Sequence, residues 1–99
     1  MEESNGSATS PINVQLAAQK AVNYLQRLAP QMGDQITNTR LEEIELSEDE
    51  SFWFITLGFD RLINDQFLVQ LQPKVERDYR QFKIDAATGE VKAMKIRTV

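Results

Sequence analysis

The sequence contains neither cysteine nor histidine. The absence of cysteine excludes disulfides, thiol nucleophiles and thiolate metal sites, and the absence of histidine removes imidazole from acid–base catalysis. No stretch approaches the roughly 20 apolar residues that a membrane-spanning helix needs. The first ten residues also lack the basic start and apolar run of a signal peptide. A cytoplasmic chain with no membrane partner is therefore our default expectation.

Glycine and positive charge are also in short supply. The four glycines are isolated from one another, so no glycine-rich phosphate loop is present. The serine and threonine hydroxyls have no histidine to activate them. With 11 Lys plus Arg against 15 Asp plus Glu, the net charge of −4 argues against binding to nucleic acid. We expect no enzymatic activity and no cofactor.

The length and composition indicate one domain with one core. The chain has 99 residues, of which 41% are hydrophobic and 26% are charged. Residues 1–10 are rich in polar and small side chains, which predicts a flexible tail ahead of a domain over residues 11–99.

An amphipathic helix is predicted from Ser10 to Ala29. Ser10 can cap the first turn and Pro11 fits inside it, whereas Pro30 and Gly33 end the helix. The apolar side chains recur at spacings of three, four and seven, which places them on one face: Val14, Ala17, Ala18, Ala21, Leu25 and Leu28. The alanines would let this helix lie close to a sheet.

Alternating apolar residues after the helix predict four antiparallel strands. The alternation groups these residues into strands: Ile44 and Leu46; Trp53, Ile55, Leu57 and Phe59; Arg80, Phe82 and Ile84; Met94 and Ile96. Polar connectors at residues 47–51 and 85–90 predict hairpin turns, with Gly89 at positive φ. The predicted fold is α+β, a helix packed on a four-stranded antiparallel sheet. Residues 61–75 fit a strand, a helical turn or a packed loop.

The charged residues favour solvated faces over a metal site. The acidic run from Glu42 to Glu50 lacks the spacing of a calcium loop, and Glu43 and Glu45 point away from Ile44 on a strand. The basic residues gather toward the C-terminus, so we expect ion pairs between them and the acidic first strand.

The aromatic residues supply the candidate interaction surface. Trp53 shares the parity of the core residues, whereas Phe52 and Phe54 project from the opposite face. A second chain, including another copy in a homodimer, or residues 61–75 would have to cover that face. The proposed contact residues are Phe52, Phe54, Phe67, Leu68 and Val69.

The hairpin from Tyr79 to Val91, with its Asp-x-x-Thr-Gly-Glu-Val turn, resembles the hairpin of PepSY and PepSY-like domains. The helix-on-sheet form also resembles cystatin-like domains, although the Gln-x-Val-x-Gly inhibitory loop is missing. The resemblance implies a non-catalytic module that binds or regulates a peptidase or another effector protein. A domain that binds a small molecule between helix and sheet is the alternative.

Overall fold

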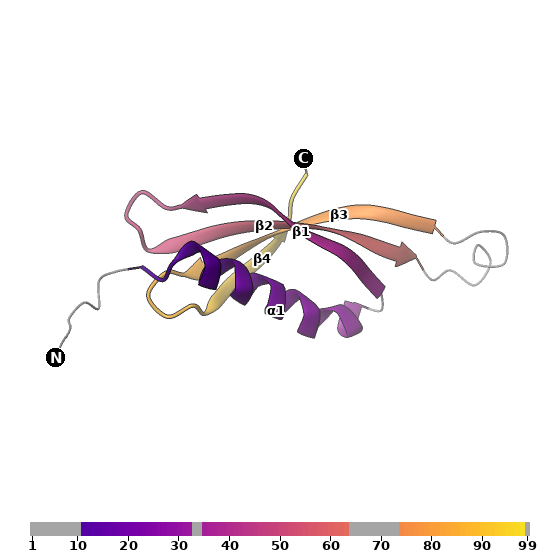
Figure 1. Ribbon diagram of the computed structural model, residues 1–99, viewed down its shortest axis with the longest axis horizontal. Helices are drawn as coiled ribbons and strands as arrows, with labels where there is room; N and C mark the ends of the chain where they lie inside the picture. The colour runs from indigo at the N-terminus through magenta and orange to yellow at the C-terminus, as the bar shows by residue number, and fades with distance from the viewer. Residues whose placement is uncertain (1–10, 33–34, 64–73, 99) are drawn as a thin grey trace.

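The computed structural model describes residues 11–32, 35–63 and 74–98, which form one helix and one antiparallel sheet (Figure 1). The elements are α1 (Val14–Met32), β1 (Gln35–Leu46), β2 (Phe52–Ile63), β3 (Lys74–Asp85) and β4 (Val91–Ile96). The spatial order of the strands is β1-β2-β3-β4, so β1 and β4 are the edge strands. The helix lies across one face of the sheet, which confirms the predicted α+β fold.

The start of α1 differs from the prediction. Asn13 is the N-cap, because its side-chain Oδ1 accepts a hydrogen bond from the Leu16 backbone N–H at 2.8 Å. Pro11 therefore precedes the helix instead of occupying its first turn. Ser10, the predicted cap, lies outside the described residues.

The end of α1 also differs from the prediction. The helix continues through Pro30 to Met32, past the stop predicted at Ala29. Pro30 is exposed, so water can reach the carbonyl whose helical donor the proline ring removes. Gly33, the second predicted stop signal, is outside the described residues.

The core lies between α1 and the middle of the sheet. Its fully buried members are Ala17, Ala21 and Leu25 from the helix and Ile55, Leu57, Phe59, Phe82 and Ile84 from the strands. The Tyr24 ring meets the Phe82 ring edge-on, with centroids 6.0 Å apart and planes at 73°. Burial of each large apolar side chain contributes about 1.5–3 kcal/mol, so this layer supplies most of the cohesion.

Trp53 fastens the segment before α1 to the sheet. Its indole N–H donates a hydrogen bond to the Ile12 carbonyl at 2.9 Å, and its partly buried ring packs against the core. The Ile12 N–H donates in turn to the Ala86 carbonyl at 2.7 Å. This position agrees with the core role predicted for Trp53.

β1 extends well before the alternating pair Ile44 and Leu46, and two β-bulges interrupt it. The register with β2 shifts between Thr37 and Arg40 and again between Leu41 and Glu43. Each bulge adds one residue and reverses the in–out alternation. A period of two therefore cannot be followed along this strand in the sequence.

The turn between β3 and β4 has the predicted chemistry. Asp85 Oδ1 accepts hydrogen bonds from the backbone N–H groups of Ala87 at 2.8 Å and Thr88 at 3.0 Å. Gly89 has a φ of 80°, a backbone angle that residues other than glycine rarely adopt. The connector 47–51 joins β1 to β2 as the predicted hairpin.

The segment that the sequence left open is partly strand. β2 continues through Arg61 to Ile63, and β3 begins at Lys74. Residues 64–73, which include the proposed contact residues Phe67, Leu68 and Val69, lie outside the described residues.

Candidate functional site

Phe52 and Phe54 lie on the face of the sheet that α1 leaves open, as the sequence predicts, and both are partly buried. The Lys83 ammonium lies 4.2 Å from the centroid of the Phe52 ring. Phe54 borders a shallow hollow of about 290 Å³ whose other walls include Glu45 and Gln81. The apolar surface of these two rings is therefore smaller than strand parity alone suggests.

Ionic contacts around Gly58 occupy the next part of the open face. Arg77 donates to the Asn38 carbonyl at 2.9 Å, to Asp60 at 3.2 Å and to Glu42 at 3.1 Å. A Cβ on Gly58 would lie 2.6 Å from Glu42 Oε2 and 3.0 Å from Arg77 Nη2, so the absent side chain makes room for this pair. Hydrogen bonds from the Asn38 amide and the Arg77 guanidinium lower the pKa of Asp60.

A second ion pair crosses the same face. Arg97 Nε lies 2.9 Å from Glu43 Oε1, and hydrogen bonding to this guanidinium lowers the pKa of Glu43. The pairs Arg77–Glu42 and Arg97–Glu43 are of the predicted kind, because each joins a carboxylate of the first strand to a basic residue nearer the C-terminus. A partner docking on the middle of the open face would have to displace these contacts, which makes this face a poor binding surface.

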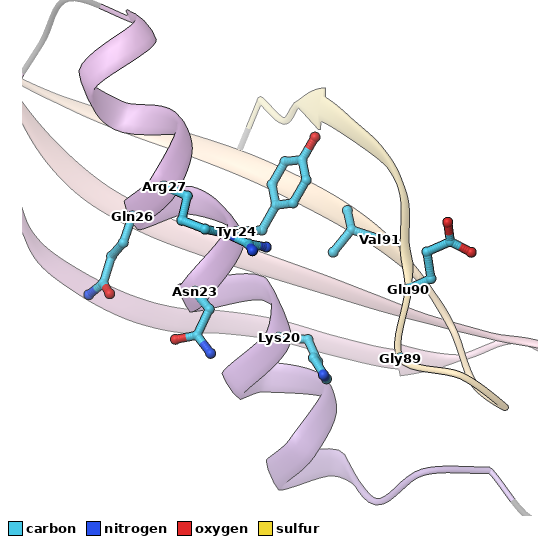
Figure 2. Close-up of a pocket in the computed structure, with 8 residues that line it drawn as sticks. All are labelled: Lys20, Asn23, Tyr24, Gln26, Arg27, Gly89, Glu90 and Val91. Atoms are coloured by element: carbon cyan, nitrogen blue, oxygen red, sulfur yellow. The ribbon is translucent and has the colours of Figure 1, made fainter.

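On the helix side, a groove of about 620 Å³ separates α1 from the β3–β4 turn and the start of β4. Its lining comes from the helix residues Lys20, Asn23, Tyr24, Gln26 and Arg27 and from Gly89, Glu90 and Val91 (Figure 2). Figure 2 shows Tyr24 and Val91 facing one another across the groove, whereas the Glu90 carboxylate points away from the helix. The groove thus has an apolar interior and a polar rim.

Gly89 lets the β3–β4 turn approach the helix closely. A Cβ at this position would lie 3.1 Å from Lys20 Cε, which shows how closely the aliphatic stem of Lys20 approaches the turn. Lys20 is also among the residues that line the groove. Positive φ and this close approach both favour glycine here.

β4 begins in the wall of the groove, at Val91, and is an edge strand. Among the described residues it pairs only with β3, so its outer backbone groups have no strand partner. The pairing is regular from Ala93 to Ile96, beyond a register shift that leaves Lys92 as an extra residue. Ile96, on the helix side of the strand, is 75% exposed. This edge can therefore accept another strand.

Positive charge without an ionic partner gathers along this groove and strand. Arg61, Arg77, Arg80 and Arg97 each contact carboxylates, and Lys92 pairs with Glu90 at 2.9 Å. By contrast, Lys20, Arg27 and Lys95 form no ion pair within the described ranges, and neither do Arg40 on β1 and Lys83, whose ammonium lies over the Phe52 ring. The first three cations flank the groove or lie on β4, so the surface would attract a negatively charged ligand.

The sequence did not single out this groove. Lys20, Tyr24 and Arg27 are spaced by four and three residues, which places them on one flank of the helix beside the apolar stripe. That spacing is a usable signal, but the opposite wall comes from residues about 65 positions later in the chain, which only the fold brings near.

Neither a cluster of metal-binding side chains nor a membrane-spanning helix is found among the described residues. No three carboxylates gather there closely enough to hold a metal ion. The same part of the chain has no helix with the length and hydropathy that crossing a membrane requires. Comparisons with protein-family models, with curated proteins and with solved structures give no match. The PepSY resemblance thus rests on the hairpin and on the order of the elements.

Proposed function

We propose that this chain is a non-catalytic binding module that receives an extended segment of another protein along the outer edge of β4, against α1. The observation that carries the proposal is the open β4 edge beside a groove with an apolar interior. An added strand would bond to the edge through its main chain and place alternate side chains in the groove. Figure 1 shows the first half of α1 beside β4 and the β3–β4 turn, before the helix crosses the sheet toward the start of β1.

The other edge of the sheet is less suited to this role. The two bulges in β1 interrupt its regular hydrogen-bonding edge, and acidic side chains follow the strand into the turn. Both features are common devices that prevent an edge strand from pairing. β4 has one register shift, at Lys92, and pairs without interruption from Ala93 to Ile96, whereas the equally long uninterrupted part of β1, from Glu43 to Leu46, carries two carboxylates.

The basic residues of β4 favour a foreign partner over a second copy. Two β4 strands pairing with each other would bring Lys92 and Lys95 of both copies close together. Control of a peptidase or another effector, which the PepSY resemblance implies, would follow if the bound segment came from that protein. Binding of that segment by this chain would then be the means of regulation.

Photo-crosslinking tests this assignment. A photoreactive residue at Ile96 should crosslink to a partner, and the same residue at Val75 should not. Both positions are exposed, but Val75 lies on β3 and away from the groove. The crosslinked partner peptide should then slow amide hydrogen exchange at residues 93–96. Crosslinking from Val75 or Phe54 alone would instead assign the interaction to the open face.

A small molecule in the same groove is the second candidate. The volume of about 620 Å³ lies within the range of ligand pockets, and Tyr24 and Val91 provide an apolar contact. A thermal-shift screen against metabolites separates the two candidates, because a specific small ligand raises the unfolding midpoint in the absence of any protein partner.

A further inference from the structure

We propose that the segment bound at β4 is acidic and carries two acidic residues that flank an apolar one on the helix-facing side of the strand. This inference rests on the proposed function, since it names the chemistry of the segment that the α1–β4 groove receives. Three observations support it: the spacing of the cations beside the groove, the apolar interior of the groove and the charge of the rest of the chain.

The spacing of the helix cations sets the spacing of the acids. Lys20 and Arg27 are seven residues apart, which corresponds to about 10 Å along an α-helix. An extended strand turns every second residue to the same side and advances about 3.3 Å per residue. Residues i and i+4 of a bound strand are thus about 13 Å apart, a difference that the long Lys and Arg side chains can span.

The residue between the two acids faces the interior of the groove. Tyr24 lies one helical turn from both Lys20 and Arg27, and its ring faces Val91 (Figure 2). Residue i+2 of the strand would meet these two side chains, so an aliphatic residue fits there. The resulting pattern is acidic–x–apolar–x–acidic. Lys95, on the other face of β4, would meet the side chains at the x positions.

The charge of the whole chain directs an acidic segment to this edge. The protein carries a net charge of −4, with a concentration of acid along β1 and its following turn. That region carries one exposed cation, Arg40, among its carboxylates and repels an acidic segment, whereas α1 and β4 present Lys20, Arg27 and Lys95 beside the groove. Glu90 is the one carboxylate in the groove lining, and it is held by Lys92 and directed away from the helix.

Three synthetic peptides with blocked ends test the proposal by NMR titration of the full chain. The probe is Thr-Glu-Thr-Val-Thr-Glu-Thr, and the two comparison peptides have Gln or Lys in place of Glu. We expect the Glu peptide to shift the amides of residues 93–96 together with those of Lys20 and Arg27. Its affinity should fall at about 0.5 M salt, and the Gln peptide should bind less tightly.

A double variant tests whether Lys20 and Arg27 cause the preference for an acidic peptide. The double variant Lys20→Gln and Arg27→Gln should weaken the binding of the Glu peptide by about 2- to 30-fold and bring its affinity close to that of the Gln peptide. The fold should be unaffected, because neither cation has an ionic partner in the described ranges. Arg40→Gln is the matched control, since Arg40 is an exposed cation on the opposite edge strand.

The outcomes separate the acidic preference from the strand-binding function. Equal binding of the Glu and Gln peptides at residues 93–96 would overturn the acidic preference and leave the strand-binding function standing. If no peptide shifts these amides, both statements fail. Shifts at Lys20 and Arg27 without shifts in β4 would mean attraction of charge without strand addition, which also overturns both. Tighter binding of a short oligonucleotide to the same residues would overturn the choice of a peptide.

Discussion

The guanidinium of Arg97 donates two hydrogen bonds to the carboxylate of Glu43, from Nε at 2.9 Å and from Nη2 at 3.2 Å. Arg97 directly follows β4 and Glu43 lies on β1, so this ion pair links the two edge strands across the open face. The twist of the sheet brings the ends of these strands within reach of two long side chains. The open face is thereby closed by polar contacts, while the groove on the helix side remains accessible.

Removal of this pair should loosen the sheet in a salt-dependent way. Arg97→Gln and Glu43→Gln should each lower the free energy of unfolding slightly, and the double variant should lose little more than either single variant. Urea unfolding at low and high salt measures the coupling, which should shrink as salt screens the charges. Lys95→Gln is the control, because Lys95 has no ion pair in the described part of the chain. Additive losses would contradict the pairing.

Acid should destabilise the fold through carboxylates whose pKa is lowered. Asp60 is held by Asn38 and Arg77, and Asp85 by the backbone N–H groups of the turn, so the folded state favours their ionised forms. Their contribution is complete above the unfolded values near pH 4 and is lost as the pH falls through the lower folded values. Urea unfolding at neutral pH and near pH 3 should show this loss. Asp60→Asn should reduce the pH dependence, and an unchanged slope would contradict the assignment.

The core should depend on Leu25 far more than on Leu16 of the same helix. Leu25 is fully buried among the helix and sheet residues, so Leu25→Ala should lower the free energy of unfolding by about 2–5 kcal/mol. Leu16 is 43% exposed on the same helix, and Leu16→Ala should change it by about 0.5 kcal/mol or less. Chemical unfolding followed by circular dichroism measures both. Similar losses from the two variants would place the core elsewhere.

The parts of the fold that the sequence predicted are those where local pattern and burial agree. The helix stripe of Ala17, Ala21 and Leu25 and the strand parity of Ile55 and Leu57 all face the core. Each element satisfies a single period, 3.6 or 2, so its buried side can be found without knowing the rest of the fold. Gly89 was equally readable, because its turn needs a positive φ.

The elements that escaped prediction break a period or depend on distant residues. In β1, Asn38 adopts a φ of 54° at the first bulge, and Glu42 and Glu43 contribute consecutive carboxylates to the same face. Pro30 stands inside a helix that it was expected to end. The contacts of Arg77 and the groove between Tyr24 and Val91 join positions more than 15 residues apart. No local pattern encodes such contacts, so three-dimensional structure was needed to find them.

Trp53 should control how the start of α1 docks on the sheet. Its indole N–H bonds the Ile12 carbonyl, and Ile12 is the residue whose own N–H reaches Ala86 beyond β3. Trp53→Phe keeps an aromatic ring but removes the donor and some volume, so the free energy of unfolding should fall by about 1–3 kcal/mol. Circular dichroism is the suitable probe, because Trp53 is the single tryptophan.

The same variant should act locally before it acts globally. Amide hydrogen exchange should accelerate in the first turn of α1, at Leu16 and Ala17, more than in the middle of the helix near Leu25. Phe54→Leu is the matched control. Phe54 directly follows Trp53 in β2 and faces the open side of the sheet, so this change leaves the indole hydrogen bond in place. Uniform acceleration along α1, or none, would show that the Trp53–Ile12 contact does not hold the helix start.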